Sequence, residues 1–192
     1  MAVLRNLLAL VGLVVVIGGI YLAGTLGPIL SEFDPGFKKT YVAFAQKLLD
    51  TKDPGDAMVY KVPVQEGIST DDVKESLKSL ATERDFLFVG DAPFYKQVEA
   101  VTGKPFRHVS FMSFCDVMVG KMMLEYNPAY TAFMPCRISL VEDEKGNLAL
   151  YTMALDMMIH GGKELPPELK KEALRVWQVI KDMMQGAAAG EF

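Results

Sequence analysis

Two cysteines, Cys115 and Cys136, are the residues whose type and spacing best suit chemistry in this chain of 192 residues. Cys115 ends a segment rich in aromatic and β-branched residues, and Cys136 begins another after a stretch of helical character. A connection that returns the chain to the same sheet can place two such thiols side by side at one sheet edge. The pair has three interpretations: a disulfide, two buried inert thiols, or a functional thiol or metal pair.

A disulfide is expected if the domain lies in an oxidising compartment. It would close a loop of about twenty residues and stabilise the fold by about 3 kcal/mol in the chain-entropy model. Thiolate chemistry would instead need a nearby positive charge, and Arg137 directly follows Cys136. Because adjacent strand residues point to opposite faces, we expect Arg137 to lie away from the thiol, against Glu142 or water.

Metal binding would combine the cysteines with the two histidines, His108 and His160. Neither histidine has a second histidine or a cysteine three or four positions away, as a local ligand motif would. Copper(I) suits cysteine and methionine together, and the chain has twelve methionines. They include Met112, Met118, Met122, Met123, Met153, Met157 and Met158. Methionine also fills irregular cores well, so core packing is the favoured interpretation of these residues.

The remaining polar residues predict no conventional enzyme. The acidic pairs Asp71-Asp72 and Asp143-Glu144 fall where a helix cap and a hairpin turn are expected, and acids are normal there. The sequence has no phosphate loop, nucleophile elbow or dinucleotide fingerprint, so no catalytic residue or cofactor is predicted. The net charge is −4 with lysine and arginine scattered, which argues against nucleic acid as a partner.

The N-terminal segment lacks charge from residue 7 to residue 30. As a helix it would be about 36 Å long, against a hydrocarbon core of about 30 Å, so it can span a bilayer. A cleaved signal peptide is the alternative, with cleavage near Gly24 or Gly27. Tyr21 and Leu22 occupy the wrong places for a small-x-small site before Gly24, which favours a retained anchor over residues 1–31.

The charges that flank this segment predict its orientation. Arg5 and the free amine precede it, whereas Glu32 and Asp34 follow it, so we expect a cytoplasmic N-terminus. Lys38 and Lys39 also follow the segment and favour the opposite orientation. The domain would then lie outside the cytoplasm, which is the periplasm if the protein is bacterial.

A strip of small residues runs along the same segment. Gly19, Ala23 and Gly27 recur every four residues and would let another helix approach closely. Small residues are also common in any spanning helix, so the strip admits a membrane-protein partner without requiring one. The lipid bilayer is the other expected partner.

The rest of the chain alternates strand and helix patterns. A linking helix over 37–49 and an exposed loop over 51–56 precede the domain, so we divide the chain into 1–31, 32–56 and 57–192. Strands are predicted over 58–64, 86–89, 106–115, 138–141 and 148–152, with helices after residues 69, 93, 117 and 166. This order predicts an α+β domain whose mainly antiparallel sheet is covered by helices on one face.

The final helix has the clearest pattern. Its apolar stripe contains Trp177, which we expect in the core. We expect the helix to end at Gly186, with the alanines beyond it forming a loose tail.

Three short motifs resemble a known family. Residues 114–116 (Phe-Cys-Asp), residues 134–138 (Met-Pro-Cys-Arg-Ile) and the hairpin over 141–150 are similar to domain-of-unknown-function family 302. In that family a Cys-Asn-Pro or related triplet precedes the middle helix, and a Leu-Pro-Cys or related triplet follows it. The resemblance covers roughly residues 58–184 and implies a TATA-binding-protein-like α+β fold. It implies no activity, because the family has no established reaction.

The match to these triplets is partial. Cys115, Pro135 and Cys136 fit them, whereas Asp116-Val117 replaces Asn-Pro and Met134 replaces leucine. Two functions of different class remain open. One is a membrane-anchored, non-catalytic accessory protein or subunit of a larger membrane assembly. The other is a ligand, metal or thiol-redox module that uses the cysteine pair, with its small-molecule ligand undefined.

Overall fold

The computed structural model describes residues 2–192 and contains five strands and nine helical segments within them. In chain order they are α1 (Ala2–Leu30), α2 (Phe37–Thr51), α3 (Pro54–Met58), β1 (Val59–Pro63), α4 (Thr70–Glu83), β2 (Leu87–Ala92), α5 (Phe94–Thr102), β3 (Val109–Cys115), α6 (Val117–Tyr126), η1 (Pro128–Phe133), β4 (Cys136–Glu142), β5 (Leu148–Met153), α7 (Asp156–His160) and α8 (Pro167–Ala188).

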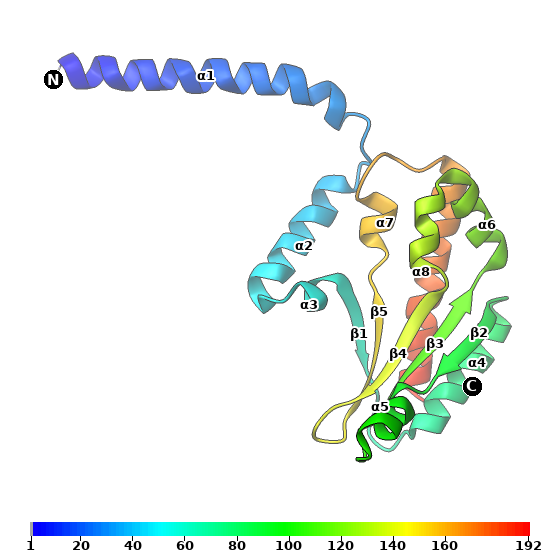
Figure 1. The fold of residues 1–192 in the computed structure, drawn as a ribbon. Helices are drawn as coiled ribbons and strands as arrows, with labels where there is room; N and C mark the ends of the chain where they lie inside the picture. Colours follow the sequence, from blue (N-terminus) through cyan, green and yellow to red (C-terminus); the bar gives the residue numbers. More distant parts are fainter. Residues whose placement is uncertain (1) are drawn as a thin grey trace.

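The five strands form one antiparallel sheet in the order β1-β5-β4-β3-β2. The predicted hairpin joins β4 to β5, and its turn is held by Asp143, whose carboxylate accepts from the backbone N–H groups of Lys145 and Asn147. The edge strands β1 and β2 are consecutive along the chain and lie at opposite edges of the sheet (Figure 1). The predicted α+β class with an antiparallel sheet is confirmed.

The core lies between one sheet face and the helices α4 and α8, which also contact each other. Alternate residues of β3, including Met112 and Phe114, point into it, as the period of two in a strand requires. Helix α4 begins with a capping box, in which Ser69 and Asp72 satisfy each other's backbone N–H groups. Trp177 of α8 is 7% exposed and packs edge-on against Tyr60, so its predicted core position is confirmed.

The C-terminal end of α8 differs from the prediction of a loose tail. The helix continues to Ala188, and the chain beyond it is held by Ser76, whose hydroxyl donates to the carbonyl of Glu191. A Cβ on Gly186 would lie 2.8 Å from Leu80 Cδ1, so the helix packs closely on α4 at this position. Gly186 and the alanines after it therefore allow the end of α8 to pack closely on α4, and they do not form a loose tail.

Three other local predictions were incomplete. The loop predicted over 51–56 contains the start of α3, whose first turn is capped by the Asp53 carboxylate. Strand β2 extends to Ala92 with an irregularity between Phe88 and Gly90, beyond the predicted end at residue 89. Helix α7 and the 3-10 helix η1 were not predicted. The prediction that helices cover one face of the sheet is also incomplete. Helix α5 contacts the opposite face, where Phe94 packs against Phe111.

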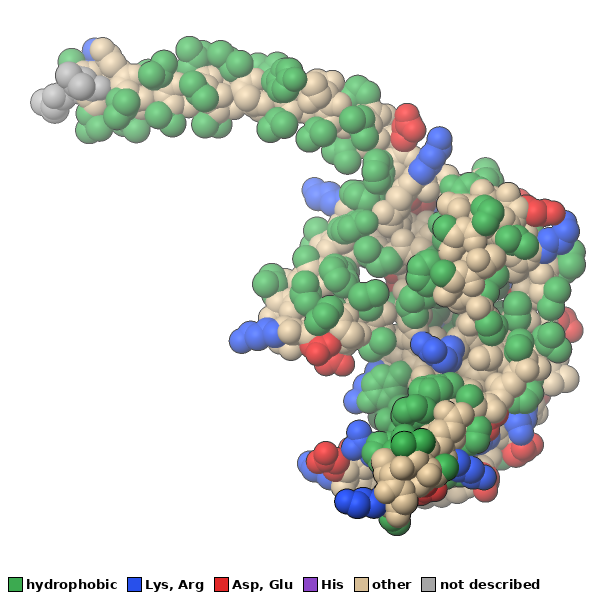
Figure 2. Space-filling model, in the orientation of Figure 1, with side chains coloured by type: hydrophobic (Ala, Val, Ile, Leu, Met, Phe, Trp, Pro, Cys, Tyr) green, Lys and Arg blue, Asp and Glu red, His purple; other side chains and the backbone are tan. Residues whose placement is uncertain are grey.

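Helix α1 projects away from the domain (Figure 1). Within its stretch Leu4–Leu30, the most apolar window has a mean hydropathy of 2.5, and none of that window is buried within the molecule. Apolar side chains cover its visible surface along the whole length, whereas charged side chains gather on the domain (Figure 2). By length and composition this helix is able to cross a membrane.

Candidate functional site

Cys115 and Cys136 lie on neighbouring strands and line one small cavity. In the β3–β4 ladder Phe114 pairs with Cys136, so Cys115 is one residue beyond that pair. The cavity has a volume of about 70 Å³ and lies between α6, α7, α8 and the segment before β4. Its lining includes both cysteines and the methionines Met123, Met134 and Met158. The expected juxtaposition of the cysteines at one end of adjacent strands is therefore what the fold produces.

Gly120 of α6 is one of the residues that line this cavity. A Cβ at this position would lie 3.5 Å from Cys115 Sγ and 3.7 Å from Met134 Sδ. The two sulfur atoms therefore flank the same point beneath α6. The sequence analysis named Met134 as part of the family motif but did not propose it as a site residue, although its place beside Pro135 and Cys136 was a usable signal.

Both thiols are in their protonated form at neutral pH. Burial, followed by the charge of Asp116, raises the pKa of Cys115, and burial raises the pKa of Cys136 to about 11. Both cysteines are half-buried and free in the structure, so the disulfide stays a prediction. Arg137 lies over the Phe111 ring, which belongs to the opposite sheet face, as the strand alternation predicted.

Asp116 has a structural role next to this cavity. Its carboxylate caps α6 by accepting from the Val119 N–H at 3.0 Å and is paired with Arg175 of α8. Burial raises the pKa of Asp116, but the bonds to Val119 and Arg175 outweigh it, so the pKa is lowered overall. Asp116, which replaces the asparagine of the family's Cys-Asn-Pro triplet, thus connects the start of α6 to α8.

The two histidines lie elsewhere. His108 directly precedes β3, at the end of the strand opposite to Cys115. Its Nε2 atom is 3.1 Å from Ser110 Oγ, and its ring stacks with the ring of Tyr95. Burial and the charge of Lys74 lower the pKa of His108, so its ring is neutral at neutral pH. His160 ends α7 and contacts Asp34. Neither histidine lines the cysteine cavity, so the four suggested metal ligands do not converge.

The methionines that were considered as copper ligands divide between several environments. Met112 is fully buried in the core, whereas Met118 is 67% exposed. Met122 is half-buried against the core, and Met153 and Met157 line a separate groove beside α2. Only Met123 and Met158 of that set reach the cysteine cavity. Across residues 2–192, no three His, Cys, Asp or Glu side chains form a group suited to a metal ion.

A second polar cluster joins the N-terminal helix to the domain. Asp34 is 3% exposed, and its Oδ1 accepts from Gly36 N–H at 2.7 Å and lies 2.8 Å from His160 Nδ1. Lys170 Nζ of α8 lies 2.6 Å from Asp34 Oδ2 and 2.6 Å from Glu164 Oε1. We call Asp34, His160 and Lys170 the junction cluster. Sequence reasoning missed it, because Asp34 lies more than one hundred residues before the other two members.

The backbone reinforces the junction cluster. Phe33 forms a β-bridge with Lys163, and Asp34 N–H donates to the Gly162 carbonyl at 2.9 Å. Burial raises the pKa of Asp34, but Lys170, Gly36 and His160 together outweigh it and hold that pKa below its ordinary value. The pKa of Lys170 is raised by its bonds to Asp34 and Glu164. The chain that leaves α1 is therefore fixed to the domain by charge pairs and by backbone bonds.

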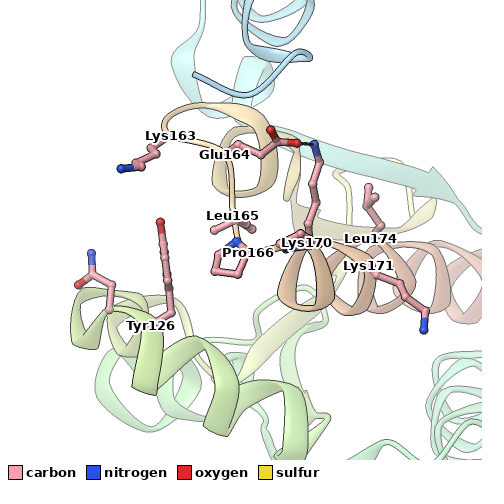
Figure 3. A pocket seen from close by; sticks show the side chains of 10 residues that line it. Tyr126, Lys163, Glu164, Leu165, Pro166, Lys170, Lys171 and Leu174 are labelled. Carbon is pink, nitrogen blue, oxygen red and sulfur yellow. Dashed lines mark hydrogen bonds and ion pairs between the residues drawn. The ribbon is translucent and has the colours of Figure 1, made fainter. Parts of the chain in front are cut away.

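Two larger hollows lie beside the junction cluster, one lined by His160 and the other by Lys170. A groove of about 720 Å³ separates α2 from β1 and α7, with Phe44, Tyr60 and Trp177 among its lining residues. A hollow of about 870 Å³ lies between Tyr126 and the start of α8 (Figure 3). Its lysines are engaged with carboxylates, as Lys170 is with Glu164 and Lys171 with Glu168.

The comparisons with known proteins agree with this architecture. The family described as "Domain of unknown function DUF302" matches residues 60–187. A relative from Aquifex aeolicus (strain VF5), described as "Uncharacterized protein", is 26% identical over 136 residues, which cover 70% of this chain and 88% of the relative.

The fold has a counterpart among solved structures. The crystal structure of an uncharacterized conserved protein DUF302 from Bacillus stearothermophilus has a TM-score of 0.54 and 16% identity, covering 66% of this chain and 95% of that chain. At this identity the likeness concerns the fold alone. The family match contains the sheet, both cysteines and most of α8, and on that basis the chain belongs to the DUF302 family.

Proposed function

We propose that this protein is a membrane-anchored, non-catalytic accessory protein or subunit of a larger membrane assembly. The observation that carries the proposal is the contrast at residues 30–34: an entirely exposed apolar helix leads directly into a buried junction cluster. An apolar helix without partners inside its own molecule is stabilised by lipid or by other spanning helices. The junction cluster then holds the domain close to the membrane surface.

The partner would meet α1 along Gly19, Ala23 and Gly27. A Cβ at Gly19 or Gly27 would meet no atom within 4 Å, so this face is open to an approaching helix. The proposed topology places the N-terminus in the cytoplasm and the domain outside it, in the periplasm of a bacterial cell. This compartment is oxidising and favours a disulfide between Cys115 and Cys136, whereas the second candidate below requires both residues as free thiols.

Copurification of the tagged full chain after extraction in mild detergent tests the accessory role. We expect a defined membrane protein to accompany the wild type and to be lost from the double variant Gly19→Ile, Gly27→Ile. Gly18→Ile is the matched control, because Gly18 lies roughly 140° around the helix from Ala23. A chain that is monomeric and alone in every mild detergent contradicts the proposal.

A reporter fused to Phe192 tests the topology, and the exposed position of this residue, at 67%, leaves room for the fusion. We expect activity from a reporter that works only outside the cytoplasm. Activity from a reporter confined to the cytoplasm would reverse the orientation.

A ligand-binding or metal-binding module is the second candidate, favoured by the shared cavity of Cys115 and Cys136. The raised pKa of both thiols disfavours the thiolate that metal binding and thiol exchange both require, so the shared cavity, and not the reactivity of the thiols, supports this candidate. Metal analysis of the purified chain, with titration of its thiols in a redox buffer, tests this candidate. Absence of both retained metal and reversible thiol titration removes it.

A further inference from the structure

The cysteine cavity collects sulfur atoms from three parts of the chain that are separate in sequence. Cys115 comes from the end of β3, Met134 from the segment after η1, and Cys136 from the start of β4. We propose that Cys115, Cys136 and Met134 bind one copper(I) ion in this cavity. The proposal rests on the second candidate function and names its ligand.

The size of the cavity selects an ion over an organic molecule. Its volume of about 70 Å³ is far below the roughly 300–1,000 Å³ of typical small-molecule sites. A single metal ion fits this space.

The position of the sulfur atoms is set by the helix above them. Cys115 Sγ and Met134 Sδ flank the point where a side chain at Gly120 would begin, at 3.5 and 3.7 Å. Thiolate sulfur binds a metal of this size at about 2.3 Å, so a bound ion would draw the sulfurs inward. The flexible methionine side chain allows that movement with little cost to the surrounding packing.

The surroundings favour a complex with no net charge. The other lining residues are mostly apolar, among them Val119, Ile159 and Val176. Asp116 is the charged residue of the lining, and it is already paired with Arg175. A monovalent ion that displaces one thiol proton forms a neutral unit with one thiolate, a thiol and a thioether. Such a unit avoids the cost of placing an unpaired charge in an apolar site.

The ligand types distinguish copper(I) from zinc. Zinc sites use cysteine, histidine and carboxylates, whereas thioether sulfur is a soft ligand that suits copper(I). Both histidines are engaged at other places, and neither lines the cavity. The available donors are therefore all sulfur.

Titration of the detergent-solubilised full chain with copper(I), under anaerobic reducing conditions and against a chromogenic copper(I) chelator, tests the proposal. We expect one ion per chain and about one proton released for each ion. Cys115→Ser and Cys136→Ser should each weaken binding at least a hundredfold. X-ray absorption of the copper should show sulfur ligands alone, with one fewer in Met134→Leu than in the wild type.

Two variants separate ligand loss from misfolding. Gly120→Ala keeps every sulfur and makes only ordinary van der Waals contacts, yet places a methyl group against both Cys115 Sγ and Met134 Sδ, so we expect at least tenfold weaker binding. Met118→Leu is the matched control, since Met118 is exposed on the same helix, and it should bind as the wild type does.

Three outcomes would overturn the copper site. They are no chelator-resistant copper(I), equal binding by Cys115→Ser and the wild type, and a disulfide between the cysteines in protein isolated anaerobically. A site that holds zinc through both cysteines and rejects copper(I) overturns this proposal while leaving a metal-binding module in place. Copurification of a membrane partner bears on the accessory role alone, so the two proposals fail separately.

Discussion

The two longest helices, α1 and α8, differ in whether their apolar side chains are buried within the molecule. Helix α8 has 22 residues and buries a stripe that includes Leu169, Val176, Trp177 and Ile180 against the sheet and α4. Helix α1 has 29 residues, is apolar on all sides, and buries none of its most apolar window in the molecule. Burial of one large apolar side chain contributes about 1.5–3 kcal/mol. For α8 that stabilisation comes from the fold, and for α1 it must come from surroundings outside the chain.

The largest expected effect is in α8. Trp177→Ala should lower the free energy of unfolding by about 3–5 kcal/mol, because it removes a buried aromatic ring and leaves a cavity. Urea unfolding in mild detergent, followed by far-ultraviolet circular dichroism, measures the change. Leu174→Ala on the same helix is the control, since Leu174 is 41% exposed. An equal loss of unfolding free energy in Trp177→Ala and Leu174→Ala would mean that the apolar stripe of α8 contributes no more to stability than its exposed face.

The junction between the two regions should show an intermediate effect. Asp34→Asn removes the charge that Lys170 and His160 contact, and we expect a loss of about 1.5–3 kcal/mol, the range for hydrogen bonds to charged groups. Glu32→Gln changes a neighbouring exposed carboxylate that lies 3.7 Å from Lys163, and should change stability by less than about 1 kcal/mol. The same unfolding assay compares them. A result in which Asp34→Asn matches Glu32→Gln would show that the junction cluster adds no stability.

The same cluster predicts a dependence on pH. The pKa of Asp34 in the folded protein is held below its ordinary value of 3.8, so its ionised form is favoured by folding. Its contribution is therefore complete above the unfolded pKa and is lost as the pH falls below 3.8 through the folded pKa. Unfolding free energies measured between pH 6 and about pH 3 should fall less steeply in Asp34→Asn than in the wild type. Parallel curves for the two proteins would contradict this assignment.

The smallest effect is expected in α1. Val15 is 67% exposed in the molecule, so Val15→Ala should change the unfolding of the domain by less than about 0.5 kcal/mol. Its side chain is largely free of contacts within the molecule, so its truncation should leave the packing of the domain unchanged. A loss above about 1 kcal/mol would show that α1 packs against its own domain, and would remove the contrast with α8.

Local patterns were sufficient to predict most of the fold. The apolar stripe of α8, the cap at Ser69 and the hairpin around Asp143 each depend on residues close together in sequence, and each is present. The place of β1 beside β5 depends on pairing across almost ninety residues, as between Val62 and Leu150, and no local pattern specifies it. The tail was mispredicted, because glycine and alanine suit both a loose end and very close packing.

The cysteine site was only partly predictable for the same reason. The strand ends that carry Cys115 and Cys136 could be inferred from their positions in the sequence. The contribution of Met134 depends on the missing side chain of Gly120, which becomes visible only when α6 is placed over the strand end. The contact between Asp34 and His160 joins residues 126 positions apart, and neither residue has a neighbouring signal that marks it.

The β-bridge between Phe33 and Lys163 also restricts how the domain can search for a partner. Only Ser31 and Glu32 lie between the end of α1 and the bridge, so the junction has little slack. A long flexible linker would spread the domain through a large volume, whereas a short fixed connection confines it to a thin layer beside its anchor. Under the proposed function, a partner in the same membrane would therefore meet the domain at a raised effective concentration without any additional contact between the two proteins.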